Sequence, residues 1–184
     1  MFYTQEELKD LGFKELGHNV LISKKASLYG VANISLKNNI RIDDFCTISA
    51  GTNGIIIGNY VHIAVYSSLM GQGEIILEDY SGLSSRVSIY SSTDDYSGNY
   101  LTNPTVPSEY KNIITGKVHL KKHVIVGAGA VILPNVTIGE GSAIGSLSLV
   151  NKNCDEFGIF AGTPAKFIKN RNKHILELEA NLKK

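Results

Sequence analysis

The sequence predicts an all-β solenoid built from hexapeptide repeats. From position 120 to 154 an aliphatic residue recurs at every sixth position, and a small residue follows four places after each one. The aliphatic positions are Leu120, Val126, Ile132, Ile138, Ile144 and Val150, and the small ones are Val124, Ala130, Val136, Ser142, Ser148 and Cys154. A period of six fits neither an α-helix of about 3.6 residues per turn nor an alternating strand. It fits a solenoid in which each hexapeptide forms one short strand and one turn, and stacked coils share a core.

At 184 residues the chain has the length of a single domain. We expect residues 1–20 to form an N-terminal helix and lead-in, residues 21–156 the solenoid, and residues 157–184 an exit segment with a C-terminal helix. The first helix is predicted by Thr4 and Glu7, which have the spacing of a capping box, with Gly12 as its stop.

The repeat begins before the regular run and changes register three times, each time near glycine or asparagine. These shifts indicate small bulges at the corners of the coil. Ala26 and Ala32 are expected to be the small partners of the first group, and about five to six coils result. The successive groups of large aliphatics are Ile22 and Leu28, then Leu36, Ile42 and Ile48, then Ile57, Ile63 and Leu69, then Leu77, Leu83 and Ile89.

The hexapeptide pattern is interrupted from position 93 to about 117. The interruption contains prolines, tyrosines and two adjacent aspartates but no period of six. A loop of this length inside a regular solenoid is usually functional, because ordering it is costly. The solenoid is therefore expected to carry one long excursion loop.

Composition excludes several classes of function. The net charge is +1, so nothing indicates nucleic-acid binding or a basic membrane patch. The polar start MFYTQEELKD and the absence of a long apolar run predict no signal peptide and no membrane span, so we expect a cytoplasmic protein. Cys46 and Cys154 both fall on small positions of the repeat, so we expect them to pack in the core rather than form a disulfide or a metal site.

The hexapeptide ladder, the interrupting loop and the closing segment AGTPAKFIK resemble the left-handed parallel β-helix acyltransferases over nearly the whole chain. The galactoside and maltose O-acetyltransferases match without a gap from Ile57 to Asp94. Three further segments resemble the enzymes that acetylate the amino group of dTDP-4-amino-4,6-dideoxyglucose (viosamine). They are FYTQEELKDLGFKELG, NIRIDDFC and DDYSGNYLTNPTVP.

The resemblance implies a homotrimer with acetyl-CoA in the groove between neighbouring prisms. Carried onto this chain, the pantetheine arm passes the backbone of Ala128 and Ser146. Asn151 and Lys152 lie near its far end, and Lys166 and Lys169 meet its phosphates. Lysines are suited to that role because phosphates require cations, although ordinary solvated charge is an equal alternative for each one.

Asp94 occupies the place of the catalytic loop histidine of the sugar O-acetyltransferases. A carboxylate with a pKa of about 4 is a poor base for an alcohol at neutral pH, whereas the proton of an ammonium group is removed much more easily than that of an alcohol. The substitution therefore favours transfer to nitrogen. His62 is the second candidate base, with Asp94 or Asp95 holding the acceptor; a corner histidine bonded to the next coil is the structural alternative.

Arg86 and Tyr96 are further candidates for contacts with the nucleotide or the sugar, and packing is the alternative for both. We expect His119 and His123 to face solvent. A γ-type carbonic anhydrase would need three histidines around zinc, and the spacing of the histidines does not match it, so we expect no metal site.

The sequence thus predicts an acetyl-CoA-dependent N-acetyltransferase that acts on a nucleotide-linked amino sugar, favouring dTDP-4-amino-4,6-dideoxyglucose, for surface polysaccharide (O-antigen) biosynthesis. A sugar O-acetyltransferase of the galactoside or maltose type is the alternative, and a non-catalytic solenoid scaffold is the third reading. Direct transfer without an acyl-enzyme is expected, because no Cys or Ser adjoins a histidine in a nucleophile motif.

Overall fold

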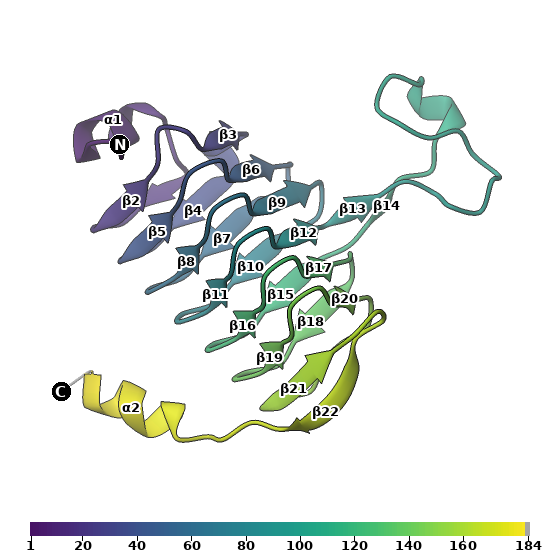
Figure 1. Cartoon of the computed structure of the whole chain (residues 1–184). Coiled ribbons are helices and arrows are strands. Elements are labelled where there is room, and N and C mark those ends of the chain that lie inside the picture. Colours follow the sequence, from purple (N-terminus) through teal and green to yellow (C-terminus); the bar gives the residue numbers. More distant parts are fainter. Residues whose placement is uncertain (183–184) are drawn as a thin grey trace.

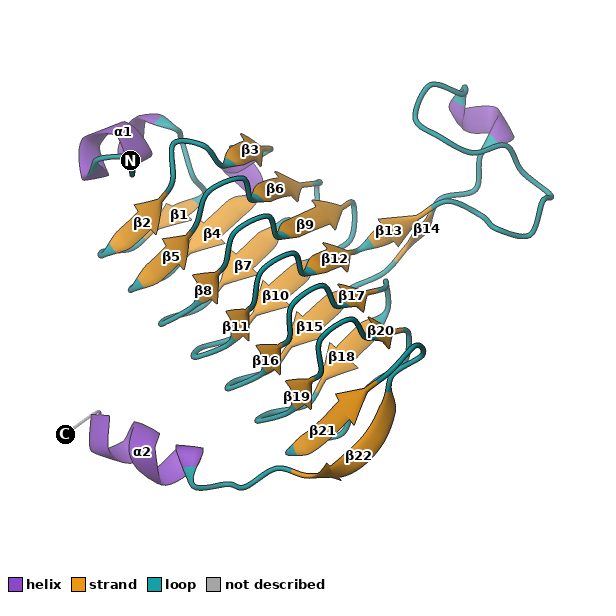
Figure 2. Cartoon of the chain, viewed as in Figure 1, coloured by secondary structure: helices purple, strands orange, loops and turns teal. Residues whose placement is uncertain are grey.

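A parallel β-solenoid of about seven turns forms the body of the molecule in the computed structural model, which describes residues 1–182. Three flat sheets enclose the core as the faces of a prism, and the chain visits them in a fixed order (Figures 1 and 2). This confirms the predicted fold class, with one strand before the first predicted repeat and two strands after the last one.

We name the faces in the order in which each coil visits them. The first face contains β1 (Glu15–Leu16), β4 (Ile34–Leu36), β7 (Ile55–Ile57), β10 (Ile75–Leu77), β15 (Val118–Leu120) and β18 (Val136–Ile138). The second face contains β2 (Val20–Ile22), β5 (Ile40–Ile42), β8 (His62–Ile63), β11 (Gly82–Leu83), β16 (Ile125–Val126), β19 (Ala143–Ile144), β21 (Gly158–Ala161) and the antiparallel β22 (Lys166–Asn170). The third face contains β3 (Ser27–Tyr29), β6 (Thr47–Ala50), β9 (Ser68–Gly71), β12 (Ser88–Tyr90), β17 (Val131–Ile132) and β20 (Leu149–Val150).

The sixfold aliphatic residues fill the prism. Every large aliphatic predicted from Leu36 to Val150 is at most 3% exposed, and Cys46 and Cys154 are buried without a disulfide. One prediction at the start of the coil is wrong. Ala32 is exposed in a short 3-10 helix, Val31–Asn33, because the extra residues of the first register shift loop out of the core there.

The turns between faces form three columns of stacked corners. The first corner joins the first and second faces, the second corner joins the second and third faces, and the third corner joins the third face to the next coil. Most coils place one residue in the left-handed region at the first and second corners, as at Tyr80 (φ 59°) and Arg86 (φ 61°). At the first corner of several coils the stacked rings of Tyr60, Tyr80 and His123 have centroids 5.0 Å apart. Aromatic stacking therefore offsets a backbone conformation that is otherwise costly for residues other than glycine.

The interruption of the repeat forms an arm that projects from the third corner (Figure 1). Its neck is an antiparallel pair, β13 (Ser92–Thr93) and β14 (Ile114–Thr115), and its tip contains a short 3-10 helix, Ser108–Tyr110. The coils on either side stack directly, because β10 pairs in register with β15.

Two helices flank the solenoid. α1 (Gln5–Asp10) has the predicted capping box, with the Thr4 hydroxyl accepting from the Glu7 N–H. α2 (Ile175–Leu182) follows β22, and the last two residues of the predicted C-terminal segment lie outside the described residues. Within residues 1–182, no helix has the length and apolar character needed to cross a membrane.

Candidate functional site

A hollow of about 290 Å³ lies on the outer surface of the second face. Outward-pointing residues of successive strands form a row across this face, and the row runs from Arg41 through His62, Gly82 and Ile125 to Ala143. Gly82 supplies no side chain, so the row is open between His62 and Ile125. The hollow is lined by His62, Ala64, Gly82, Leu83, Ser84, Ser85 and Ile125.

His62 is held at the rim of this hollow by a carboxylate from the preceding coil. Its Nε2 lies 2.8 Å from Asp43 Oδ2, and Asp43 Oδ1 accepts from Arg41 Nε at 2.7 Å. Partial burial pushes the pKa of Asp43 upward, but the hydrogen bonds from Arg41 and His62 outweigh it, so the pKa is lowered. A carboxylate can only accept, so Nε2 is the donor in this contact, and Nδ1 is the ring nitrogen left for a ligand. His62 thus lies within a strand, half exposed, rather than at a corner.

The second corner presents a column of backbone N–H groups without partners. The residues that precede the left-handed position on four successive coils are Val65, Ser85, Ala128 and Ser146. Within the part of the chain that the structure describes, their N–H groups donate to no backbone or side-chain acceptor. Each carbonyl of the first three is used, because it accepts from the left-handed residue of the next coil, as Ala128 O does from Leu147 N at 2.9 Å. The column therefore offers donors at intervals of about 4.8 Å.

The coils at this corner pack closely. A Cβ at Gly127 would lie 2.5 Å from the backbone nitrogen of Ser146, which no real contact permits. Gly127 therefore allows the turns that carry Ala128 and Ser146 to stack with little side-chain cover.

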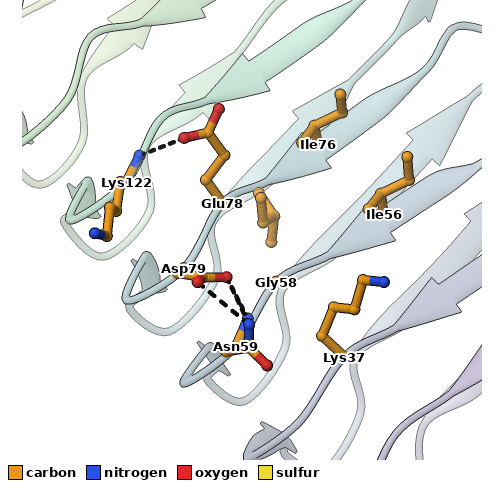
Figure 3. A pocket seen from close by; sticks show the side chains of 9 residues that line it. Lys37, Ile56, Gly58, Asn59, Ile76, Glu78, Asp79 and Lys122 are labelled. Carbon is orange, nitrogen blue, oxygen red and sulfur yellow. Dashed lines mark hydrogen bonds between the residues drawn. The ribbon is translucent and has the colours of Figure 1, made fainter. Parts of the chain in front are cut away.

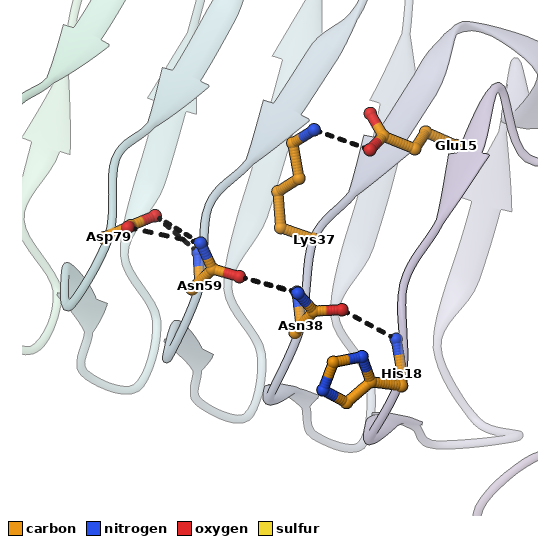
Figure 4. A network of polar contacts seen from close by, with 6 residues as sticks. All are labelled: Glu15, His18, Lys37, Asn38, Asn59 and Asp79. Atoms are coloured by element: carbon orange, nitrogen blue, oxygen red, sulfur yellow. Dashed lines mark hydrogen bonds and ion pairs between the residues drawn. The ribbon is translucent and has the colours of Figure 1, made fainter. Parts of the chain in front are cut away.

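The first corner satisfies four of the corresponding N–H groups with side chains. The amides of His18, Asn38 and Asn59 donate to the side-chain oxygens of Asn38, Asn59 and Asp79, each from the next coil, at 2.7–3.1 Å (Figure 4). The ladder stops at Asp79, and the amide of Lys122 donates instead to Glu78 at 3.1 Å. A hollow of about 400 Å³ lies beside this ladder on the first face (Figure 3), and none of the predicted site residues line it.

The predicted coenzyme residues are divided between two edges of the prism. Ala128 and Ser146 lie at the second corner, and Lys166 lies close to it, because it pairs with Ala161 at the end of β21. Lys169 is further along β22, paired with Ile159. Asn151 and Lys152 follow β20 and are exposed at the third corner, across the third face from Ser146. Within one chain, therefore, Ala128, Ser146 and Lys166 lie along the second corner. Asn151 and Lys152 lie at the third corner, on the other edge of the third face.

The two aspartates at the start of the arm have different surroundings. Asp95 braces the arm, because it accepts from the Ser97 amide at 2.7 Å, from the Ser97 hydroxyl and from Asn112 Nδ2 at 3.1 Å. Asp94 is half-buried and has no hydrogen-bond or ionic partner within residues 1–182. It lines a small hollow of about 170 Å³ together with Asn103 and Lys111. Asp94 is thus the carboxylate that is available to a ligand.

Tyr96 and Arg86 are the remaining predicted substrate contacts. Tyr96 is 91% exposed on the arm, with no ring contact to the coil among the described residues. Arg86 is exposed at the second corner, where its guanidinium lies 5.4 Å from the centroid of the Tyr66 ring. Neither residue lines the hollow beside His62.

In a single chain His62 lies on the second face, whereas Asp94 lies beyond the far edge of the third face. The hollow adjoins the second corner through Ser84, whereas Asp94 follows β13 at the third corner, with β12 between them. Figure 1 shows the arm extending away from the second face. One chain alone does not bring the two candidate bases together.

The other two histidines differ from the expectation that they face solvent. His119 bonds to Glu78 at 2.6 Å on the first face, and its side chain is largely buried. His123 is buried at the first corner, stacked on Tyr80 and bonded to Glu179 of α2 at 2.7 Å. The expectation is wrong because α2 covers this corner. No cluster of three or more His, Cys, Asp or Glu side chains suited to a metal occurs within residues 1–182.

The cysteines are poor nucleophiles in these surroundings. Burial raises the pKa of Cys154 to about 11 and also raises the pKa of Cys46. The thiolate is the reactive form, so neither thiol is activated at neutral pH.

Sequence reasoning missed three features of the site. Asp43 lies nineteen residues before His62 and contacts it only because the coils stack. Gly82 carries a signal, since it is a glycine inside a strand. The unpaired N–H groups give no signal in the sequence, because every residue except proline has a backbone N–H and its hydrogen bonding depends on the fold.

A β-helix with an open hollow and a column of free amides on one side is the architecture of a hexapeptide transferase. The family model "Bacterial transferase hexapeptide (six repeats)" matches residues 117–152. The chain is 56% identical over 184 residues, covering 100% of this chain and 96% of the relative, to the dTDP-4-amino-4,6-dideoxy-D-glucose acyltransferase of Escherichia coli. The chain therefore belongs to the hexapeptide-repeat acyltransferase family, and the predicted assignment as an acyltransferase is confirmed.

Solved structures agree. AntD, an N-acyltransferase from Bacillus cereus, in complex with dTDP and 3-hydroxybutyryl-CoA, superposes with a TM-score of 0.95 at 51% identity, covering 98% of this chain and 95% of that one. Other AntD structures carry replacements of its serine 84 and aspartate 94, and this chain has Ser84 and Asp94 at the same numbers. A maltose O-acetyltransferase from Clostridium difficile matches with a TM-score of 0.59 at 19% identity, covering 92% of this chain and 75% of that one, which shows a shared fold only.

Proposed function

We propose that this protein transfers an acyl group from acyl-CoA to the 4-amino group of dTDP-4-amino-4,6-dideoxyglucose. The column of free N–H groups at the second corner, which leads to a hollow lined by His62 and Ser84, carries this proposal. The names of the relatives support it, because the Escherichia coli enzyme is named for that sugar and a serine 84 mutant of AntD has been solved with the sugar and coenzyme A.

The donor fits the second corner for a simple chemical reason. Pantetheine is an extended chain with two amide groups, and its carbonyl oxygens need N–H donors. Ser146 and Ala128 are exposed residues whose amides have no acceptor within residues 1–182, and Lys166 at the base of the track supplies a cation near the phosphates. If the pantetheine chain continues for about one more coil, it brings the thioester to Ser85 and Ser84 at the edge of the hollow.

The reaction is an attack of the amine nitrogen on the thioester carbonyl. A C–N bond forms, the C–S bond breaks, and coenzyme A leaves as a thiol after taking up a proton. The acceptor starts as an ammonium ion, so one proton leaves nitrogen before the attack, and a second leaves nitrogen as the amide forms and protonates the departing thiolate. His62 Nδ1 and the Asp94 carboxylate are the two candidate acceptors for the first proton, and the Ser84 hydroxyl is placed to donate to the carbonyl oxygen as negative charge develops on it.

We further propose a homotrimer in which the arm of one chain reaches the hollow of the next. The separation of His62 from Asp94 within a chain supports this arrangement, and so does the position of Asn151 and Lys152 on the other edge of the third face. A shared site predicts complementation: His62→Ala and Asp94→Asn variants, each impaired alone, regain activity when co-expressed as mixed trimers. We also propose a cytoplasmic enzyme serving surface polysaccharide assembly.

The acceptor is tested with purified protein, acetyl-CoA and a matched pair of nucleotide sugars. One is dTDP-4-amino-4,6-dideoxyglucose, and the other carries a hydroxyl in place of the amine. We expect thiol release and an N-acylated product, seen by mass spectrometry, with the amino sugar alone. Turnover of the hydroxyl sugar, of galactosides or of maltose, without turnover of the amino sugar, would overturn the proposal.

A further inference from the structure

The hollow on the second face exists because residue 82 has no side chain. The outward row places a guanidinium at Arg41, an imidazole at His62 and a branched aliphatic chain at Ile125, and Gly82 interrupts it. Ile125 is 47% exposed, so its side chain forms an apolar wall that neighbouring side chains leave partly uncovered.

The backbone does not require glycine at this position. Gly82 is absent from the residues with positive φ, and a Cβ built on it meets no atom within 4 Å. This differs from Gly127, where a Cβ would collide with the next coil. Glycine inside a strand destabilises the fold by about 0.5–1 kcal/mol relative to alanine. The empty space, rather than the conformation, is therefore the property that glycine provides here.

The position of this space along the donor track indicates its occupant. Ser85, the next free amide of the column after Ser146 and Ala128, lines the hollow together with Ser84, so a thioester delivered past those two residues reaches the edge of the hollow there. Beyond the thioester carbonyl the donor has only its acyl chain. Ile125 and Ala64 line the hollow with carbon, which suits an apolar chain.

We propose that Gly82 determines acyl specificity, because it opens the space that accepts the acyl chain of the donor and sets the length that fits. This inference rests on the proposed function only in placing the donor along the second corner. It makes no use of the identity of the acceptor.

The test is a size series at position 82, with Gly82→Ala and Gly82→Val, assayed with acetyl-CoA and butyryl-CoA. Each added carbon shortens the space, so kcat/KM for butyryl-CoA relative to acetyl-CoA should fall in steps, by about 10-fold or more for Gly82→Val. Ala143→Val is the matched control, because it adds two methyl groups to the same row, two strands further on and outside the lining of the hollow. It should leave the ratio unchanged.

Folding and acceptor choice are separated from this effect by two further measurements. Thermal unfolding of Gly82→Ala should show a midpoint equal to or above that of the wild type, because the added methyl group meets no atom. Calorimetric Kd values for butyryl-CoA and free CoA need no acceptor, and their ratio should shift toward CoA in Gly82→Val. Equal losses for both donors, or an unchanged Kd ratio, would overturn the assignment even if the wild type acylates the sugar. Correct Kd shifts without turnover of the sugar would instead refute only the proposed acceptor.

Discussion

The first and second corners of the prism have the same backbone but opposite chemistry. Both place a left-handed residue in each turn and pass its N–H to the carbonyl of the previous coil. At the first corner the amides of His18, Asn38, Asn59 and Lys122 are bonded by side chains of the next or the previous coil, although those of Asp79 and Glu140 have no acceptor within residues 1–182. At the second corner Val65, Ser85, Ala128 and Ser146 all leave theirs without an acceptor in the described part of the chain. Turns with the same backbone are therefore either bonded to a neighbouring coil or left open to a ligand, depending on whether a neighbouring coil supplies an oxygen acceptor.

The rings follow the same division. At the first corner Tyr60, Tyr80 and His123 stack continuously, and α2 covers the end of the column through Glu179. At the second corner the stack of Phe45 and Tyr66 ends at Arg86, and Leu147 two coils further on is 76% exposed. The aromatic cover is lost from Arg86 onward, beside Ser85, which is the thioester end of the proposed donor track.

The largest expected effect is on catalysis. His62→Ala should lower kcat by about 10²–10⁴ if His62 takes the proton, with little change in thermal stability, because the side chain is 52% exposed and bonds only to Asp43. Steady-state kinetics on the amino sugar measure this. His119→Ala is the control, since it also removes an imidazole bonded to a carboxylate but lies on the first face. An unchanged kcat in His62→Ala, with a large loss in Asp94→Asn, would transfer the role to Asp94.

Breaking the ring column at the first corner should cost stability instead of activity. Tyr80→Ala removes two stacking contacts, worth about 0.5–1.5 kcal/mol each, and also the burial of the ring. Urea unfolding should show a lower free energy of unfolding by about 2 kcal/mol. Leu147→Ala is matched, because it is also a left-handed corner residue, and should change stability little. Equal losses for the two variants would show that the corners do not differ.

Removal of one N–H from the track tests its role in donor binding. Ala128→Pro deletes the donor, and the turn can accept proline, since Pro134 precedes the left-handed Asn135 in a turn of the same kind at the third corner. The KM for acetyl-CoA should rise by up to about 10-fold, because one hydrogen bond contributes about 0.5–1.5 kcal/mol. Ala128→Gly retains the N–H and serves as the control. The idea fails if the proline variant folds normally and binds acetyl-CoA as tightly as the glycine variant.

The smallest expected effect concerns acid stability. Partial burial raises the pKa of Glu78, but hydrogen bonds from His119 and Lys121 outweigh it and leave the pKa lowered. Because its pKa is lower in the folded state, the ionised Glu78 stabilises the protein at pH values above the unfolded pKa of about 4.3. This contribution is lost as the pH falls through the folded pKa. Glu78→Gln should therefore be less stable than the wild type by about a few tenths of a kcal/mol at pH 7, and the difference should vanish once the pH has fallen below the folded pKa. A difference that grows on acidification would contradict this sign.

The sequence predicts the core well because the core alone has a strict period. Val126 and Ile132 had to be buried if the repeat forms a coil, and both are fully buried. Outward positions follow no period, so Asp43 beside His62 and Glu179 beside His123 could not be predicted. The availability of Asp94 and the bracing role of Asp95 could not be separated either, because the two adjacent carboxylates look alike until the arm is folded.

The narrow neck of the arm has a consequence for evolution and engineering. β13 and β14 bring the two ends of the insertion together, while β10 and β15 pair as though nothing lay between them. The arm is therefore a cassette whose length and composition can change without disturbing the stacked coils. In the proposed trimer, where the arm reaches the acceptor, exchanging this cassette would change acceptor recognition and leave the coils of the proposed donor track intact.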